Sequence, residues 1–317
     1  MNRDHNPVHE PVLVEEVLVG LDCRPGCVYV DGTVGEGGHA TAILNRTAPD
    51  GLLWGLDQDP VVLQAAAARL APFTSRFRLF HRSYAQLGEI LTEAGEPAVA
   101  GILLDLGLSL HQLQRSGRGF SFQGDEPLDM RFNPERPGKT AADILNRATP
   151  AELEKIFREY GEEPRARRYA RLVVEARRQH PFRFTQQLVK LVQQAQGPGR
   201  RTGEKNPATR VFQALRIAVN RELEELALFL GQAPAWLLPG GRLVVISYHS
   251  LEDRLVKKKL LAWDREGLMR RLTRKPVAPS REEVQRNPRS RSAKLRVAEK
   301  VGEKEKQYGQ TGDPPIK

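Results

Sequence analysis

In the first hundred residues of the chain, short apolar runs alternate with helical segments. The runs are rich in β-branched and aromatic residues and lie at Cys27–Asp31, Leu52–Leu56, Phe77–Phe80 and Ala98–Leu104. Helical patterns separate them, at His39–Leu44, Val61–Leu70 and Tyr84–Glu93. Strands that alternate with helices of this length are typical of βαβ units in a parallel sheet. The sequence therefore predicts an α/β fold.

The alternation stops near residue 113 and resumes only after a long helical stretch. The later predicted elements are a loop at residues 117–137, helices within Lys139–Gln194, a basic loop at Gly197–Asn206, one long helix at Pro207–Phe229, a buried strand at Gly241–Ser247, a helix at Leu251–Trp263, and short strands at Met269–Val277 and Lys294–Val297. We therefore expect a discontinuous sheet domain, residues 1–113 and 222–298, interrupted by a helical insertion at residues 114–221. Residues 299–317 contain few apolar side chains, which predicts a disordered tail.

Positive charge is concentrated in two blocks of the chain. The 49 lysine and arginine residues exceed the 39 acids by ten. Residues 158–221 carry a net charge of +10 and residues 254–317 carry +11, whereas residues 1–157 carry −7 and residues 222–253 carry −4. Segregation of this kind favours a polyanionic partner such as RNA, because lysine and arginine contacts to phosphate release condensed counterions. A solvated, charge-rich surface is the alternative.

Several classes of protein are excluded by simple features of the sequence. The apolar stretches are interrupted by charges before they reach the roughly 20 residues of a membrane span, and Met1–Glu10 lacks an apolar signal-peptide core. Only two cysteines are present, Cys23 and Cys27, which excludes a disulfide scaffold and fits a reducing, cytoplasmic environment. Together with His5 and His9 they resemble a zinc ligand set, but the usual C-x2-C spacing is absent, so we expect no metal.

A glycine-rich loop follows the first predicted strand and leads into a helix. It runs from Asp31 to Ala40 and fits the pattern G-x-G-x-x-A through Gly35, Gly37 and Ala40. Such loops let a nucleotide approach the backbone amides at a helix start. An acid about twenty residues on, Asp57, has the position of a residue that binds ribose hydroxyls. The motif alone is compatible with NAD(P), with S-adenosylmethionine, or with a turn that binds no ligand.

The charge of the loop favours S-adenosylmethionine. Asp31 and Glu36 would both face the pyrophosphate of NAD(P), and like unit charges about 4 Å apart repel by ~4 kcal/mol at an effective dielectric constant near 20. S-adenosylmethionine has no phosphate and carries a sulfonium and an ammonium, which neighbouring acids would stabilise.

Four further sites have both a structural and a functional interpretation. Asp59, followed by Pro60, is most simply a helix N-cap. The segments 83–86 and 109–112 have capping-box form, so Gln86 and Gln112 are candidates for capping as much as for ligand contacts. Tyr84 could lie on an adenine ring or pack in the core. At residues 247–253, Ser250 and Asp253 could form a capping box, while His249 could face a substrate at the strand end.

Six motifs in the chain closely resemble those of the RsmH (MraW) family of S-adenosylmethionine-dependent 16S rRNA cytosine-N4 methyltransferases. They are Asp31-Gly-Thr-x-Gly-x-Gly-Gly-His39, Gly55-Leu-Asp-Gln-Asp-Pro60, Leu103-Leu-Asp-Leu-Gly-x-Ser109, Arg118-Gly-Phe-Ser-Phe122 with Pro127-Leu-Asp-Met-Arg131, Asn206-Pro-Ala-Thr-Arg210 and Ile246-Ser-Tyr-His-Ser-Leu-Glu-Asp-Arg254. The resemblance extends from about His9 to Val301. It implies a class I, Rossmann-like methyltransferase sheet with an inserted helical subdomain that recognises rRNA.

The resemblance also implies the cofactor and the residues that contact it. The implied contacts to S-adenosylmethionine are Gly37, Gly38, His39, Asp57, Tyr84, Asp105 and Gln112. The chain departs from the usual Ser-Ser-Pro-Gln-like run of the family at Leu110 and His111, although Gln112 is retained. The implied partner is the 16S rRNA of the small ribosomal subunit, without membrane or DNA.

The implied reaction transfers a methyl group to the exocyclic N4 of a cytosine. Positive charge develops on that nitrogen, so hydrogen-bond acceptors must be placed beside it in advance. The candidates are the Asp105 carboxylate, backbone carbonyls near Leu106, and His249, and the sequence does not choose among them. A non-enzymatic RNA-binding assembly factor that retains a nucleotide pocket is the alternative function.

Overall fold

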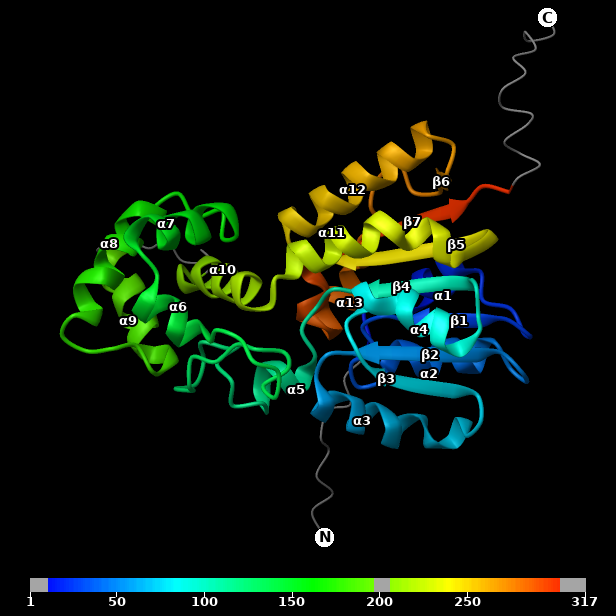
Figure 1. Cartoon of the computed structure of the whole chain (residues 1–317), viewed down its shortest axis with the longest axis horizontal. Helices are drawn as coiled ribbons and strands as arrows, with labels where there is room; N and C mark the ends of the chain where they lie inside the picture. Colours follow the sequence, from blue (N-terminus) through cyan, green and yellow to red (C-terminus); the bar gives the residue numbers. More distant parts are fainter. Residues whose placement is uncertain (1–10, 197–205, 303–317) are drawn as a thin grey trace, which may run out of the picture. The chain divides into compact units, whose positions relative to one another are not determined.

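The structure is a computed structural model that describes residues 11–196 and 206–302 (Figure 1). The predicted basic loop at Gly197–Asn206 therefore lies almost entirely outside the described residues. The chain divides into two compact units. The first comprises residues 1–107 and 225–317, and the second comprises residues 108–224.

The first unit is built on a mixed sheet that, within the described residues, has seven strands in the order β3-β2-β1-β4-β5-β7-β6. The strands are β1 (Val28–Asp31), β2 (Leu52–Asp57), β3 (Phe77–His81), β4 (Val99–Asp105), β5 (Leu237–Ser247), β6 (Met269–Arg271) and β7 (Lys294–Lys300). Strands β1 to β5 are parallel, whereas β7 is antiparallel to both β5 and β6. The predicted Rossmann-like α/β sheet is confirmed. Its strand order reverses between β1 and β4, the kind of switch point at which open α/β sheets bind ligands.

Helices cover both faces of this sheet. The helices of the first unit are α1 (Val14–Leu21), α2 (Gly38–Arg46), α3 (Pro60–Leu70), α4 (Leu87–Ala94), α12 (Ser250–Arg265) and α13 (Arg281–Arg286), and α11 (Glu222–Gln232) begins in the second unit and continues into the first. Successive residues of a strand point to opposite faces, so Leu243 and Val245 of β5 join the core under α4, α11 and α12. Val244 and Ile246 join the core under α1, α2 and α3.

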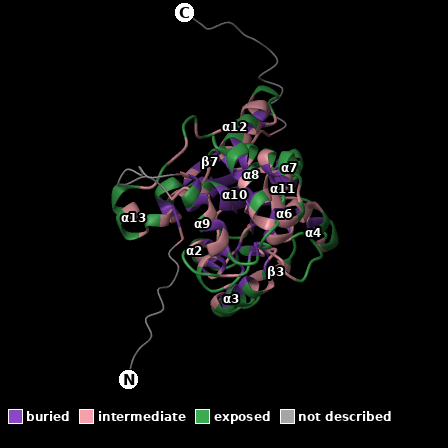
Figure 2. Cartoon of the chain, turned by 90° about the vertical axis from the view of Figure 1, so that its left-hand side faces the viewer, coloured by how far each residue is buried: buried purple, intermediate pink, exposed green. Residues whose placement is uncertain are grey.

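The second unit is helical and has a core of its own. Its helices are α5 (Leu110–Gln114), α6 (Ala141–Arg147), α7 (Pro150–Glu159), α8 (Ala166–Arg177), α9 (Thr185–Gln196) and α10 (Ala208–Asn220). Thr149 caps α7, with Pro150 at the first helical position and Glu152 completing the capping box. Of the residues of α10, only Arg210 is exposed, and the helix is largely buried in Figure 2.

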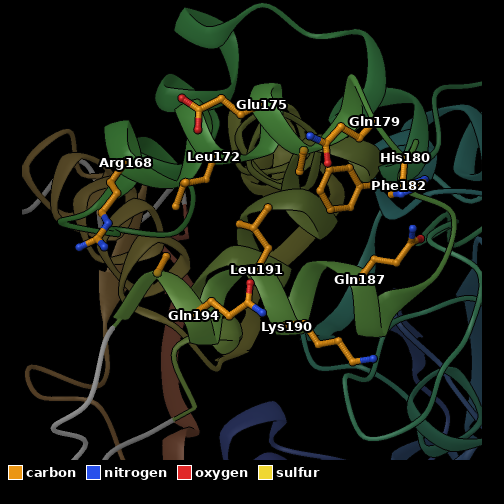
Figure 3. Close-up of a pocket in the computed structure, with 12 residues that line it drawn as sticks. Arg168, Leu172, Glu175, Gln179, His180, Phe182, Gln187, Lys190, Leu191 and Gln194 are labelled. Carbon is orange, nitrogen blue, oxygen red and sulfur yellow. The ribbon is translucent and has the colours of Figure 1, made fainter.

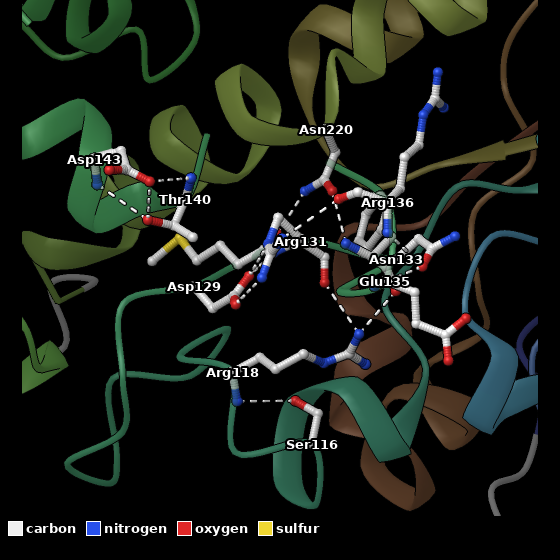
Figure 4. Close-up of polar contacts among 12 residues, drawn as sticks. Ser116, Arg118, Asp129, Arg131, Asn133, Glu135, Arg136, Thr140, Asp143 and Asn220 are labelled. Carbon is white, nitrogen blue, oxygen red and sulfur yellow. Dashed lines mark hydrogen bonds and ion pairs between the residues drawn. The ribbon is translucent and has the colours of Figure 1, made fainter. Parts of the chain in front are cut away.

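A long loop between α5 and α6 is held by polar contacts rather than by regular structure (Figure 4). The buried Arg118 guanidinium donates to the carbonyl oxygens of Arg131, at 3.0 Å, and Phe132, at 2.7 Å. Arg131 in turn donates twice to Asp129, at 2.8 and 2.7 Å. The Asn220 side chain accepts from the Phe132 amide at 2.8 Å and donates to a loop carbonyl at 2.7 Å. The arginines of this motif thus hold the fold of the loop.

Three sequence predictions about elements were wrong. The long helix predicted at Pro207–Phe229 is two helices, because Arg221 adopts a left-handed conformation (φ 53°) that ends α10. The strand predicted at Met269–Val277 is only three residues long. The sheet also continues past the expected start of the tail at residue 299: β7 includes Glu299 and Lys300, and the Glu299 carboxylate accepts a hydrogen bond from Arg242 at 2.9 Å.

No helix among the described residues has both the length and the apolar character that a membrane span requires.

Candidate active site

The glycine loop connects β1 to α2, as predicted, and it lies at the switch point of the sheet. Gly35 (φ 54°) and Gly37 (φ 81°) adopt the left-handed backbone conformation that glycine enters without steric cost. At Gly32 a side chain is excluded by space instead, because its Cβ would lie 2.5 Å from Leu104 Cδ2. The Gly35 amide donates to Asp57 Oδ2 at 3.1 Å, which ties the loop to the end of β2.

The two acids that follow β2 have different roles. Asp59 is the N-cap of α3, and its Oδ1 accepts from the Val61 amide at 3.2 Å, which confirms the predicted cap. Asp57 accepts one backbone amide on each oxygen, from Gly35 at 3.1 Å and from Asp59 at 2.9 Å. Each carboxylate oxygen has a further lone pair, which can accept from a hydroxyl. Burial raises the pKa of Asp57 to about 6, although the amide of Asp59 opposes the rise.

Three titratable side chains gather at the ends of β1 and β4. Asp31 is 1% exposed, and its Oδ1 accepts from the Thr33 amide at 3.2 Å. The buried His39 imidazole has its Nε2 3.5 Å from Asp105 Oδ2, an electrostatic contact that is long for a hydrogen bond. Burial raises the pKa of Asp31 to about 7, against the opposing effect of His39. Burial alone would raise the pKa of Asp105 too, but His39 and the Tyr248 hydroxyl outweigh it and lower that pKa below its usual value.

This cluster contains buried polar atoms that lack hydrogen-bond partners among the described residues: Asp31 Oδ2 and both ring nitrogens of His39. Buried polar groups in folded proteins are nearly always paired, so such orphans at a ligand-binding edge fit a polar ligand. Carboxylates from the ends of three adjacent strands, Asp31, Asp57 and Asp105, give the site a negative character. These carboxylates fit the sulfonium, ammonium and ribose hydroxyls of S-adenosylmethionine, and their negative charge makes the site unsuited to a pyrophosphate.

Tyr84 and Gln112 both have structural roles. Tyr84 follows β3, is buried, and packs edge-on against Phe229 with ring centroids 5.6 Å apart. Ser83 and Gln86 form the predicted capping box beside it. In the second unit, Gln112 forms the other predicted capping box: its Oε1 accepts from the Ser109 amide at 3.0 Å, and Ser109 Oγ accepts from the Gln112 amide at 3.1 Å. Of the seven predicted cofactor residues, the structure therefore places six in the first unit, at the carboxyl edge of its sheet.

Sequence reasoning missed Tyr248. This residue follows the last residue of β5, and β5 pairs with β4 so that Ile246 lies opposite Asp105. The Tyr248 hydroxyl donates a hydrogen bond to Asp105, and burial, followed by the Asp105 charge, raises its pKa well above 10. A Cβ on Gly107 would lie 2.8 Å from Tyr248 Cε2, so the ring fills the space that this glycine leaves. The available signal was position: the ends of two adjacent parallel strands meet at one edge.

His249 caps a helix. It is the N-cap of α12, its Nδ1 accepts from the Glu252 amide at 3.4 Å, and its Nε2 lies 3.0 Å from Glu252 Oε1. The capping box predicted for Ser250 and Asp253 is therefore wrong by one residue. Asp253 instead accepts from Arg296 Nε at 2.7 Å.

The zinc-like set can be judged only at its cysteines, because His5 and His9 lie outside the described residues. Burial raises the pKa of the Cys23 thiol to about 12. A thiol of this pKa remains protonated near neutral pH, whereas zinc binds the thiolate. Cys23 is therefore a poor metal ligand.

Comparison with known proteins finds relatives over nearly the whole chain. The model of the MraW methylase family matches residues 6–301. The Ribosomal RNA small subunit methyltransferase H of Syntrophus aciditrophicus is 47% identical, over 92% of this chain and 98% of the relative. The proteins of the same name from Geobacter sulfurreducens and Desulfotalea psychrophila are 49% and 48% identical, over 92% and 94% of this chain and 99% and 100% of the relatives.

Proposed function

Because the chain belongs to the MraW methylase family, we propose that it transfers a methyl group from S-adenosylmethionine to the exocyclic N4 of a cytosine in the small-subunit rRNA. The relatives are named for the small-subunit RNA, and the choice of N4 is what the resemblance to the RsmH (MraW) family implies. This substrate assigns the protein to the cytoplasm. The observation that carries the proposal is the buried cluster at the switch point of the sheet, in which Asp31 Oδ2 and both ring nitrogens of His39 lack hydrogen-bond partners among the described residues.

Each proposed cofactor residue has a distinct task. The Asp57 carboxylate accepts hydrogen bonds from the ribose hydroxyls, and the hydrogen bonds that it accepts from the Gly35 and Asp59 amides fix its orientation. Gly37 and Gly38 keep the start of α2 free of side chains, and His39 and Asp105 contact the polar methionyl part. Tyr84 offers its ring to the adenine. Gln112, which belongs to the second unit, is proposed as a contact from the family resemblance alone. S-adenosylmethionine, when bound, supplies an electrophilic methyl group on a cationic sulfur.

The target amine needs acceptors that turn it toward the methyl group. Its lone pair is delocalised into the ring, so reaction requires the amine to be oriented and its emerging positive charge to be stabilised. Asp105 is the favoured acceptor, because its lowered pKa keeps it ionised and Tyr248 fixes its orientation. The backbone carbonyl of Leu106, at the same strand end, is the second acceptor. His249 is less suited, since it is engaged in the cap of α12.

The distribution of charge supports separate sites for cofactor and RNA. Phosphates and a sulfonium need surroundings of opposite sign. The acidic edge of the sheet suits the cation, and the basic segments 158–221 and 254–317 suit the rRNA backbone.

The proposal is tested by methylation of small ribosomal subunits that lack the modification. Subunits and naked 16S rRNA are incubated with radiolabelled S-adenosylmethionine, and nucleosides from the digested RNA are identified by mass spectrometry. We expect N4-methylcytidine. Recovery of 5-methylcytidine would contradict the proposed acceptor atom. RNA binding with no transfer to either substrate would instead support a non-enzymatic assembly factor.

A further inference from the structure

The second unit contains a cavity between α8 and α9, and none of the residues assigned above lines it (Figure 3). Its volume is about 510 Å³, within the range of small-ligand sites. Leu172 of α8 and Leu191 of α9 form an apolar floor between the two helices. Arg168 lies at one end of the cavity, and the exposed His180 and the buried Phe182 lie at the other.

The segment around the cavity is strongly basic. Residues 165–196 contain eight arginines and lysines and a single acid, Glu175. Glu175 lines the cavity, and it pairs at 3.5 Å with Arg171, which is not a lining residue and offsets its charge. Arg168 and Lys190 line the cavity, and neither has an ion pair with another described residue. Their charges are thus available to an anionic ligand.

We propose that this cavity holds an unpaired nucleotide of the rRNA substrate, at a subsite distinct from the one that receives the target cytosine. The inference rests on the proposed function and names a place where the RNA is held. The base lies over Leu172 and Leu191 and stacks on the His180 ring. The flanking phosphates are bound by Arg168 at one end and by Lys190 on α9.

The combination of an apolar floor with a basic rim favours single-stranded RNA over other partners. A base buries a flat apolar face, and its neighbouring phosphates need cations within a few ångströms, so stacking surface and basic side chains occur together in sites for single strands. A duplex hides its base faces and would use only the rim. An apolar protein segment would use only the floor and would leave Arg168 and Lys190 unmatched.

The test uses the full-length protein and a single-stranded RNA of about 12 nucleotides with a fluorescent label, a length within the range of known single-strand sites. Ala176 lines the cavity, so Ala176→Phe fills it without any change in charge. We expect this variant to bind the RNA about tenfold more weakly by fluorescence anisotropy, because one base loses its stacking surface. Ala151→Phe, at an exposed position of α7, is the matched control and should bind like the unmodified protein.

A second pair of variants distinguishes RNA binding in the cavity from general electrostatic attraction to the basic surface. Arg168→Ala and Arg167→Ala remove the same charge from adjacent exposed positions of α8, but only Arg168 lines the cavity. The first should weaken binding more and should lower the slope of log affinity against log salt by about 0.7. If Ala176→Phe proves unstable in thermal melts, this pair decides the question.

Equal losses at Arg168 and Arg167, with normal binding by Ala176→Phe, would overturn the subsite. Duplex RNA that competes as well as the single strand would also overturn it. A loss seen only with assembled subunits, and not with free RNA, would point to a ribosomal protein and against a nucleotide. The unmodified protein is assayed for methylation in parallel, so absence of transfer tests the proposed function separately from the subsite.

Discussion

The two units of the chain place their charges in opposite ways. In the sheet unit, Asp31, Asp57 and Asp105 lie at one edge, where burial raises the pKa of the first two. Repulsion from Asp105 and Asp57 adds to the rise at Asp31, and repulsion from Asp59 adds to the rise at Asp57. In the helical unit, arginines such as Arg167 and Arg168 are exposed and keep their hydration. A buried charge is expensive without a partner and so marks a place for a specific ligand. Exposed charges are screened by salt beyond about 10 Å, so they attract a polyanion to a surface without requiring one exact position.

The largest effect is expected at Asp105. Asp105→Asn removes the ionised acceptor, and we expect methyl transfer to small subunits to fall at least ~100-fold, comparable to the loss of a preorganised electrostatic contact. Tyr248→Phe removes only the hydrogen bond that orients Asp105 and should reduce turnover by about tenfold or less. Initial rates at saturating cofactor measure both. Turnover of Asp105→Asn equal to that of Tyr248→Phe would show that the carboxylate has no role of its own.

Asp57 and Asp59 are two residues apart in the sequence, and we assign ligand binding to the first and helix capping to the second. Asp57→Ala should weaken S-adenosylmethionine binding by roughly 1–3 kcal/mol, because ribose hydroxyls lose their acceptor. Asp59→Ala should leave affinity nearly unchanged and lower the free energy of unfolding by about 1 kcal/mol through loss of the α3 cap. Titration calorimetry and thermal melts separate the two effects. Similar affinity losses in both variants would contradict the division.

Arginines of the second unit can be divided in the same way. Arg118 is buried and bonds two carbonyl oxygens, so Arg118→Ala should lower the free energy of unfolding by about 1–3 kcal/mol. The exposed pair between Arg171 and Glu175 is worth only ~0.3–0.5 kcal/mol, so Arg171→Ala should change stability very little. Chemical denaturation measures both. A large destabilisation by Arg171→Ala would show that exposed arginines of the second unit also stabilise the fold, which would contradict this division.

The smallest effect is expected from pH. Asp31 and Asp57 have pKa values of about 7 and 6 in the folded protein, above their usual 3.8. Their contribution to stability is therefore fully present below pH ~4 and is lost as the pH rises through 6 and 7. The cationic cofactor favours the ionised carboxylates, so its affinity should increase by several-fold between pH 5 and 8, with release of protons. Calorimetry in buffers of different ionisation enthalpy detects that release. Asp31→Asn should flatten the dependence of cofactor affinity on pH. A cofactor affinity that decreases as the pH rises would contradict this assignment.

The sequence predicted local features well and failed where tertiary packing decided the outcome. The parallel strands, the glycine loop and the caps at Asp59 and Thr149 follow from residue type and spacing. The break at Arg221 carries no glycine or proline signal, so the helix was predicted as continuous. The cap of α12 moved to His249 because its imidazole and Glu252 complete the box, which a search for serine and aspartate does not find.

The candidate site shows the same division. Asp57 and Asp105 were found because acids at strand ends have a chemical meaning in an open α/β sheet. Tyr248 was missed because its role depends on the pairing of β4 with β5, across more than a hundred residues of chain. The cavity between α8 and α9 has no signature in the sequence. It depends on how Leu172 and Leu191 face each other once the two helices pack.

The strand order has a consequence for how the protein is synthesised. Strands β5 and β7, which extend the sheet beyond β4, are encoded after the entire helical unit. During translation, residues 108–224 therefore leave the ribosome before the sheet can be completed, and domains generally fold as units while the chain emerges. The helical unit can acquire its structure while Asp105 still lacks Tyr248. Catalytic competence thus arises late, after the last strand has left the exit tunnel.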